Sequence, residues 1–410
     1  MEYGLIGYPL KHSFSKEIHQ LISDYDYSLK ELTEAELADF MRKADFKGIN
    51  VTIPYKQAVI PYLNEIDRQA QMIGAVNTIV NENGKLKGYN TDFFGLLSLL
   101  KKINCTIENK NVLILGTGGT SNTAAAVCEY LNAANVDKVS RKNDGQYLTY
   151  AQLYQKADKY QIIINATPCG MYPHNSDCAV QTDMFPNLEA VVDVIYNPLN
   201  TKLVMQAQKN GIKAIGGLYM LVSQAVHASS LFQSENYSAE LIEEIYQKIK
   251  KQKQNIVFIG MPTSGKTTIG KIISKQLKRE FYDIDDIIVK KNNKEIVDIF
   301  HKNGEKVFRE YEQQAVKEVY RTNGAVISCG GGTILKEENV QMLKQNGLFI
   351  FLDRDLDKLQ AGKNRPITSS REQLEEIYQQ RYGLYRQYAD IVIKNNTTVA
   401  AAVEQIEKEL

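Results

Sequence analysis

The segment NIVFIGMPTSGKTTIGKIISKQLKRE, residues 255–280, decides the fold of the second half of the chain. Its part from Gly260 to Thr267 fits the pattern GxxxxGK[ST], with an apolar run before it and a helix-forming stretch after it. Glycines let backbone N–H groups turn toward phosphate oxygens, and the helix start adds a positive dipole. The segment therefore predicts a P-loop that binds a nucleotide, with Lys266 at the β and γ phosphates and Thr267 as a ligand of Mg²⁺. The predicted nucleotide contacts are Gly260, Ser264, Gly265, Lys266, Thr267 and Thr268.

Apolar runs that resemble strands recur on both sides of this segment and alternate with helix-forming stretches. They are VLILG at 112–116, IIINATP at 162–168, VVDVIYNP at 191–198, VISCGGG at 326–332 and LFIFLD at 348–353. Such alternation predicts α/β domains with parallel sheets. A helix-forming stretch from about 238 runs into the basic segment KKQKQN just before residue 255, and we expect the main domain boundary near residue 250.

Composition excludes several classes of protein. The 410 residues suggest two to three domains, and 43% apolar with 24% charged residues is typical of globular chains. A net charge of +1, from 49 basic and 48 acidic side chains, gives no overall field for binding nucleic acid or an anionic membrane. Five cysteines without CxxC spacing predict neither a disulfide framework nor a zinc site. Because we find no signal peptide and no apolar run near 20 residues, we expect a cytoplasmic protein.

Carboxylates and arginines follow the P-loop in a fixed order. YDIDDII carries Asp283, Asp285 and Asp286 at the end of a second strand-like segment, where a period of two predicts Asp283 and Asp285 on one strand face. Carboxylates beside a bound triphosphate can hold Mg²⁺ and polarise a hydroxyl nucleophile. Further along come Arg309 in GEKVFREYE, the run Gly330, Gly331 and Gly332, Arg365 in KNRPIT and Arg381 in QQRYGLYRQYAD.

Together with the P-loop, this order of motifs resembles shikimate kinase over residues 252–410. The resemblance implies that Asp283 serves the magnesium shell and that Asp285 binds the substrate hydroxyls. It implies that Arg309 and Arg381 bind the substrate carboxylate, with the backbone of Gly330, Gly331 and Gly332 lying against the substrate. Arg365, in a lid, would close over the transferring phosphoryl group. The catalytic residues of this half would be Lys266, Asp285 and Arg365.

A second glycine-rich turn, LGTGGTSNTAAAV at 115–127, follows the strand-like run NVLIL. It has Ser121 at the third glycine position of GxGxxG, so both a dinucleotide site and a structural turn stay open. The next strand-like run ends in Ser140, Arg141 and Lys142, and cations there suit the 2′-phosphate of NADP better than the ribose of NAD; an ordinary basic turn is the alternative. The predicted cofactor contacts are Gly116, Thr117, Gly118, Gly119, Thr120, Ser140, Arg141 and Lys142.

The first half also contains GYPLKHSFSKEIH, NVTIPYK, GAVNTIV, GYNTDFFG, NATPCGM, DVIYNPLNTKL and GGLYMLVSQAVHA. In this order they resemble shikimate dehydrogenase over residues 1–250. The resemblance implies that Lys56 and Asp92 are the catalytic pair. Outside that resemblance, Lys56 reads as a solvent-facing lysine and Asp92 as a helix N-cap. The substrate-binding residues it implies are Ser13 and Ser15 for the carboxylate, Thr52, Asn77 and Gln224 for hydroxyls and ring, and Tyr196 on the substrate side.

We therefore expect a bifunctional enzyme that uses NADP(H), ATP and Mg²⁺. The first half would reduce 3-dehydroshikimate to shikimate, and the second would phosphorylate shikimate to shikimate 3-phosphate. The expected domains are a substrate-binding lobe at 1–101 with 218–250 packing back on it, a Rossmann NADP-binding lobe at 102–217, and a P-loop kinase domain at 252–410. Partners would be small molecules, with no nucleic acid and no membrane. The alternatives are a quinate/shikimate dehydrogenase that uses NAD, and a ligand-binding regulator without catalysis.

Overall fold

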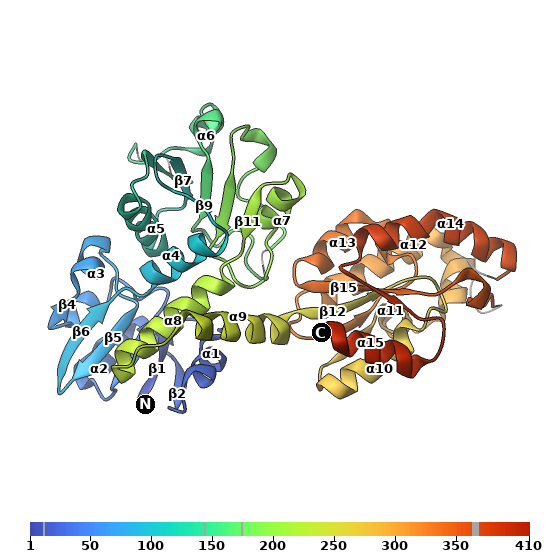
Figure 1. The fold of residues 1–410 in the computed structure, drawn as a ribbon, viewed down its shortest axis with the longest axis horizontal. Helices are drawn as coiled ribbons and strands as arrows, with labels where there is room; N and C mark the ends of the chain where they lie inside the picture. The colour runs from blue at the N-terminus through green and yellow to red at the C-terminus, as the bar shows by residue number, and fades with distance from the viewer. Residues whose placement is uncertain (11–12, 143–144, 174, 363–368) are drawn as a thin grey trace. The chain divides into compact units, whose positions relative to one another are not determined.

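The computed structural model describes the chain except for residues 11–12, 143–144, 174 and 363–368. The chain divides into two compact units, Met1–Ile249 and Lys250–Leu410, and each is treated by itself (Figure 1). Both units are built from strands that alternate with helices, as the apolar runs predicted.

The first unit begins with a six-stranded mixed sheet. Its strand order is β2-β1-β3-β5-β6-β4. β1 pairs in parallel with β2 and β3, whereas β5 runs antiparallel to β3 and β6. The turn of the β5–β6 hairpin has positive φ at Asn83 and Gly84, so the sheet departs here from the predicted parallel pairing. The elements are β1 (Tyr3–Gly7), α1 (Ser15–Ile22), β2 (Tyr27–Glu31), α2 (Glu34–Lys43), β3 (Gly48–Val51), η1 (Ile60–Tyr62), β4 (Glu65–Ile66), α3 (Arg68–Ile73), β5 (Thr78–Glu82) and β6 (Lys85–Tyr89).

The second sheet of this unit is fully parallel, in the order β11-β10-β9-β7-β8. One apolar core joins it to α4 and α5, and another joins its opposite face to α6 and α7, which explains why its central strands are apolar on both sides. The elements are α4 (Asp92–Lys102), β7 (Asn111–Leu115), α5 (Gly119–Tyr130), β8 (Asn135–Val139), α6 (Tyr150–Tyr154), η2 (Ala157–Lys159), β9 (Ile162–Asn165), η3 (Thr182–Met184), β10 (Ala190–Asp193), α7 (Lys202–Lys209) and β11 (Lys213–Ile215).

Two helices follow the second sheet. α8 (Leu218–Gln233) packs against α1 and α4. α9 (Ala239–Lys253) buries Ile245 and Ile249 in the core that α8 forms with α1. Residues 250–253 of the basic segment KKQKQN form the last turn of this helix. Gln254 follows, and Asn255 begins the next strand. The segment is helical because Lys and Gln are good helix formers and continue α9 as far as Lys253.

The second unit is a five-stranded parallel sheet in the order β13-β14-β12-β15-β16. In Figure 1, α10 and α15 cover one face, and α12, α13 and α14 cover the other. The elements are β12 (Asn255–Ile259), α10 (Lys266–Leu277), β13 (Phe281–Asp283), α11 (Ile284–Asn292), α12 (Ile296–Val319), β14 (Val326–Ser328), η4 (Thr333–Leu335), α13 (Glu337–Lys344), β15 (Gly347–Asp353), η5 (Leu356–Lys358), α14 (Arg371–Tyr388), β16 (Ile391–Lys394) and α15 (Val399–Glu409).

Within the described part of the chain, no helix combines the length and the apolar character that crossing a membrane requires.

Candidate active sites

The P-loop lies between the end of β12 and the start of α10, where the sequence predicted it. Gly260 and Gly265 both have positive φ, at 147° and 95°. A Cβ at Gly265 would lie 2.9 Å from Nδ2 of Asn395, whose side chain donates to the Ser264 carbonyl at 2.7 Å. Glycine is therefore required at Gly265 by both the backbone conformation and the close approach of Asn395.

Lys266 is buried and reaches back across the loop. Its Nζ donates to the carbonyl oxygens of Gly260 at 2.9 Å and Met261 at 2.8 Å. These two contacts hold the ammonium group over the inner side of the loop, which is where the backbone of a P-loop binds phosphate.

Thr267 and Asp283 form the second feature of the loop. The Thr267 hydroxyl donates to Asp283 Oδ2 at 2.7 Å, and Asp283 Oδ1 accepts the backbone N–H groups of Asp285 and Asp286 at 3.0 and 3.3 Å. Asp283 thus caps the start of α11, and Asp285 lies in the first helical turn. The prediction that Asp283 and Asp285 share one strand face is wrong, because the cap ends the strand at Asp283.

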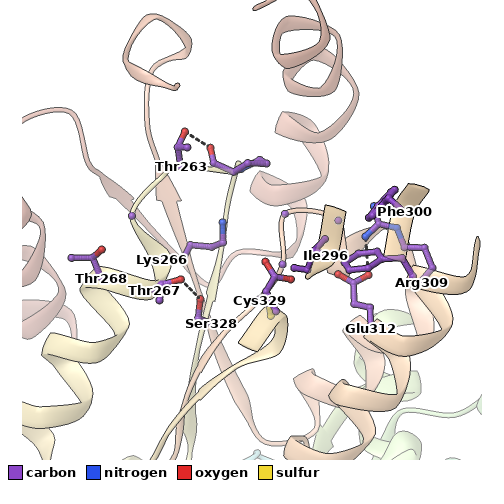
Figure 2. Close-up of a pocket in the computed structure, with 17 residues that line it drawn as sticks. Thr263, Lys266, Thr267, Thr268, Ile296, Phe300, Arg309, Glu312, Ser328 and Cys329 are labelled. Carbon is purple, nitrogen blue, oxygen red and sulfur yellow. Dashed lines mark hydrogen bonds and ion pairs between the residues drawn. The ribbon is translucent and has the colours of Figure 1, made fainter. Parts of the chain in front are cut away.

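A cavity of about 510 Å³ opens beside the loop (Figure 2). In Figure 2, Lys266, Thr267 and Thr268 lie on one side of it, and Arg309 and Glu312 lie on the other. Nine of the predicted site residues line it: Gly265, Lys266, Thr267, Thr268, Asp285, Arg309, Gly330, Gly331 and Gly332. Gly260, Ser264, Asp283 and Arg381 are not among the lining residues, and Arg365 lies outside the described residues.

Asp285 is one of two carboxylates that line this cavity, and Glu312 is the other. Burial, reinforced by the negative charges of Asp283 and Glu312, raises the pKa of Asp285 to about 7. A Cβ at Gly330 would lie 2.9 Å from Asp285 Oδ1 and 2.8 Å from Glu312 Oε1. The glycine run therefore leaves room for two carboxylates to approach the backbone. The arrangement gives a carboxyl group that can accept a proton near neutral pH.

Two arginines approach the same glycine run. A Cβ at Gly332 would overlap the Arg309 guanidinium, so this group lies directly against the backbone there. Arg381, from α14, donates through Nη1 to the Gly331 carbonyl at 3.2 Å. Its side chain is 5% exposed, and its Nε is buried with no hydrogen-bond partner among the described residues. Burial lowers the pKa of Arg381, and the charge of Arg309 lowers it further. Two neighbouring guanidinium groups, one of which has an unpaired Nε–H donor, can bind an anionic ligand.

Sequence reasoning missed Glu312, which is fully buried in α12. Its Oε2 accepts from Arg309 Nη1 at 2.9 Å, and its Oε1 accepts from the Thr333 hydroxyl at 2.7 Å. The signal was present, since an acidic residue three positions after an arginine on a helix faces it. An apolar wall of Ile296, Phe300 and Phe308 was missed as well.

In the first unit, the glycine-rich turn lies between β7 and α5. Gly116 has φ 104°, and a Cβ there would lie 2.9 Å from Cγ2 of Thr167. The Ser121 hydroxyl donates to the Gly116 carbonyl at 2.7 Å, so the serine at the third glycine position closes the turn. Gly118 is the N-cap of α5 and Gly119 its first residue, with Thr117 before them and Thr120 after them, so the backbone N–H groups of the helix start lie at this turn.

The predicted cation segment lies next to this turn. The Gly116 N–H donates to the Val139 carbonyl at 3.0 Å, and Val139 ends β8 just before Ser140. Ser140 is buried, and its hydroxyl oxygen accepts the Lys142 N–H at 3.0 Å. Arg141 and Lys142 are both exposed. The structure thus places two exposed cations close to the start of α5.

The Lys56–Asp92 pair lies past the carboxyl end of β3, near the start of β5, so it is at the end of interior strands of the first sheet. The Val51 N–H donates to the Asn77 carbonyl, and the Val76 N–H donates to the Lys56 carbonyl, both at 2.8 Å. Lys56 Nζ forms an ion pair with Asp92, and their side chains are 15% and 10% exposed. Lys56 is therefore not a solvent-facing lysine, and Thr91 rather than Asp92 is the N-cap of α4.

Thr91 joins the other predicted residues to this pair. Asn77 Oδ1 accepts the Thr91 N–H at 2.7 Å, and the Thr91 hydroxyl donates to Gln224 Oε1 at 3.4 Å. Thr52 directly follows β3 at the same end of the strands, where its N–H donates to the Ile6 carbonyl of β1 at 2.9 Å. Thr91 was not predicted, because its contacts depend on β5, α4 and α8 meeting in space.

Ser13, Ser15 and Tyr196 form a second group. The Ser13 hydroxyl oxygen accepts the Ser15 N–H at 3.2 Å at the start of α1. Phe14, between the two serines, packs against Tyr196 with the ring centroids 5.2 Å apart. Burial raises the pKa of Tyr196 to about 12, so its hydroxyl keeps its proton near neutral pH. The structure therefore gathers two hydroxyl side chains and a phenol near the start of α1.

Two family models match the chain. The model for the shikimate dehydrogenase substrate binding domain matches residues 5–79, and the model for shikimate kinase matches residues 262–410. The shikimate dehydrogenase (NADP(+)) of Clostridium perfringens strain 13 is 35% identical over 266 residues, which cover 60% of this chain and 98% of that protein. The enzyme of the same name from Clostridium beijerinckii is 38% identical over 264 residues, 60% of this chain and 96% of that protein.

Solved structures agree with these relatives. A chorismate mutase/shikimate 5-dehydrogenase fusion protein from Clostridium acetobutylicum has 34% identity and a TM-score of 0.57 over 60% of this chain and 95% of its own. The shikimate 5-dehydrogenase of Thermus thermophilus, in complex with NADP(H) and shikimate, has 27% identity and a TM-score of 0.55 over 60% of this chain and 99% of its own. Both resemblances inferred from the sequence, and the α/β fold, are confirmed. The chain therefore belongs to the shikimate dehydrogenase family and carries a shikimate kinase domain behind it, which makes it a bifunctional enzyme of the shikimate pathway.

Proposed function

We propose that the first unit reduces 3-dehydroshikimate to shikimate with NADPH and that the second unit phosphorylates the 3-hydroxyl of shikimate with ATP. The buried Lys56–Asp92 pair carries the first assignment. The cavity that Asp285 shares with the P-loop and Arg309 carries the second. The alternative of a regulator without catalysis is disfavoured, because a binding protein needs neither a buried lysine–carboxylate pair nor a carboxyl group poised beside a P-loop.

In the first unit, Lys56 is the proton donor. When bound, NADPH supplies the hydride to the ketone carbon, and the ketone oxygen must then gain a proton. The Lys56 ammonium donates that proton to the oxygen, and the ion pair with Asp92 holds the ammonium in line. Asn77 and Gln224, held together through Thr91, would bind the ring and its hydroxyls with Thr52. Ser13 and Ser15 would receive the carboxylate, with Tyr196 on the substrate side.

The cofactor of this unit is proposed to be NADP(H) rather than NAD(H). The helix start at Gly118 and Gly119 would receive the pyrophosphate, and Arg141 and Lys142 would bind the 2′-phosphate. The relatives' names contain NADP(+), which supports the same choice.

Replacing both Arg141 and Lys142 by alanine is expected to raise KM for NADPH by about 10- to 100-fold, since hydrogen bonds to a charged group contribute about 1.5–3 kcal/mol. NADH lacks the 2′-phosphate, so its KM should change little. Initial rates with the two cofactors measure this, and an equal loss with both would contradict the assignment. The kinase activity of the same variant reports whether the chain is intact.

In the second unit, Asp285 accepts the proton of the substrate 3-hydroxyl as that oxygen attacks. When bound, ATP with Mg²⁺ supplies the phosphoryl group. The hydroxyl and carboxylate oxygens of Thr267 and Asp283, 2.7 Å apart, are ligands of the type Mg²⁺ prefers and would hold the ion together with the phosphates. Lys266 stabilises charge on the phosphoryl oxygens, and Arg309 and Arg381 orient the substrate through its carboxylate. Arg365 is proposed to cover the site.

The pKa of Asp285 predicts a pH profile for the kinase reaction. A base works only when deprotonated, so kcat/KM for shikimate should fall about tenfold per pH unit once the pH drops below the pKa of Asp285, which burial raises above the usual value of a carboxyl group. Asp285→Asn should lose about 10²–10⁴-fold in kcat and should abolish this inflection. ADP release at saturating ATP measures both effects. An acidic limb that Asp285→Asn leaves unchanged would contradict the role of Asp285 as base.

We further propose that residues 1–101 and 218–250 form the substrate-binding lobe, that 102–217 form the NADP-binding lobe, and that 252–410 form the kinase domain. The two separate sheets of the first unit support this division. So does the packing of α8 against α1.

Two half-reactions test the proposed function. NADPH oxidation should require 3-dehydroshikimate, and ADP release from ATP should require shikimate, both with one purified chain. Failure of either half-reaction would contradict the corresponding assignment. Faster oxidation of quinate with NAD than of shikimate with NADP would instead support the quinate alternative.

A further inference from the structure

Arg309 pairs with two glutamates of its own helix, one at each edge of its guanidinium. Nε and Nη2 donate to Glu305 Oε1 at 3.2 and 2.9 Å, and Nη1 donates to Glu312 Oε2 at 2.9 Å. The edge formed by Nε and Nη2 is one that can bind an incoming carboxylate through two parallel N–H···O bonds. In this structure a carboxylate of the protein occupies it.

The two glutamates differ in burial. The Glu312 side chain is 1% exposed, whereas the Glu305 side chain is 53% exposed. A buried carboxylate is strongly destabilised when its cation leaves, but an exposed carboxylate regains water. Arg309 can therefore release Glu305 at low cost and keep Glu312.

Local backbone geometry places Glu305 where an anion in the cavity can replace it at Arg309. α12 is interrupted at Gly304, which has φ 77° and ψ 171°, and Glu305 is the first residue after the break. From there it reaches Arg309 one turn later, at the i,i+4 spacing. Arg309 lines the cavity that contains Asp285, so an anion in this cavity and Glu305 compete for the same guanidinium.

We propose that Glu305 is an internal competitor of the substrate carboxylate at Arg309. Glu305 pairs with the Nε–Nη2 edge of the Arg309 guanidinium, and the substrate carboxylate displaces it on binding. This inference rests on the proposed function of the kinase unit. Two consequences follow for the reaction: Glu305 raises KM for the acidic substrate, and it disfavours ring alcohols without a carboxylate, because these cannot replace the pairing they would break.

Glu305→Gln tests the proposal in the full chain. The variant should lower KM for shikimate in the kinase reaction by about two- to five-fold, the range expected from losing one exposed ion pair. The dissociation constant for shikimate, measured by calorimetry, should fall by the same factor. We expect kcat and KM for ATP to stay at their wild-type values, since Glu305 touches neither the P-loop nor the reacting oxygen in the proposed mechanism.

Three controls separate competition from a general effect of charge. Glu310→Gln removes the same charge from the exposed neighbour of Arg309, which faces another direction on the helix, and should leave KM for shikimate unchanged. The methyl ester of shikimate, which lacks the negative charge, should gain less from Glu305→Gln than shikimate does. KM for 3-dehydroshikimate in the reductase reaction should not change in either variant.

An unchanged or increased KM for shikimate in Glu305→Gln would overturn the proposal, and an increase would show that Glu305 positions Arg309 for the substrate. An equal gain for shikimate and its methyl ester would overturn it as well. These results differ from failure of the proposed function, in which the wild-type chain itself neither binds nor phosphorylates shikimate.

Discussion

Replacing Lys56 by methionine is expected to lower kcat for the reduction of 3-dehydroshikimate by about 10²–10⁴-fold, the usual contribution of a positioned acid–base group. Methionine keeps much of the length of the side chain but cannot donate a proton. Loss of NADPH absorbance measures the rate. Phosphorylation of shikimate by the same preparation should stay at the wild-type rate, because Lys56 belongs to the other unit.

Two further variants define what Lys56 does. Lys56→Arg keeps a cation beside Asp92, but a guanidinium does not give up its proton near neutral pH, so reduction should remain slow. Wild-type reduction by Lys56→Arg would show that only the charge matters and would contradict proton donation. Lys43→Met, at an exposed position in α2, removes one lysine from the same unit and should leave both activities unchanged.

Replacing Lys266 by methionine is expected to remove phosphoryl transfer almost completely. Its ammonium group donates hydrogen bonds to the carbonyl oxygens of Gly260 and Met261, and these bonds hold it over the inner side of the P-loop. Loss of a single preorganised donor at a developing charge costs about 10²–10³-fold in rate, and loss of a full charge should cost at least that. ADP release in the presence of shikimate measures the effect.

The matched control is Lys275→Met, an exposed lysine of the same helix, α10. It should keep the kinase activity, and both variants should reduce 3-dehydroshikimate at the wild-type rate. Loss of reduction in Lys266→Met would contradict two independent active sites.

The parts of the fold that could be predicted are those that depend on residues close together in the sequence. The P-loop lies between a strand and a helix because NIVFI is apolar throughout and Gly260 and Gly265 accept positive φ. The mixed first sheet could not be predicted in the same way. Its antiparallel pairing depends on the hairpin at Asn83 and Gly84, which lies among short elements without a clear period.

The acidic run YDIDDII shows where periodicity misleads. A period of two put Asp283 and Asp285 on one face, but the Asp283 side chain accepts two backbone N–H groups and starts a helix. Capping separates the two carboxylates: Asp283 meets Thr267, and Asp285 turns to the cavity. A short strand that ends in aspartate is ambiguous in sequence because the same residue type both ends strands and caps helices.

The site residues that were missed connect others over long sequence distances. Thr91 links Asn77 to Gln224, and Glu312 links Arg309 to Thr333. Neither is unusual as a residue type, and both become significant only when neighbouring elements are placed. The residues implied by resemblance could be named from sequence, whereas the residues that hold them in position required the structure.

One measurement tests the central claim most directly. The intact purified chain is incubated with 3-dehydroshikimate, NADPH and Mg-ATP, and the products are followed by mass spectrometry. We expect shikimate when ATP is withheld, shikimate phosphate when both nucleotides are present, and neither product when NADPH is withheld. Persistence of unreacted 3-dehydroshikimate with both nucleotides present, or shikimate that is formed but never phosphorylated, would contradict the assignment of two consecutive reactions to this chain.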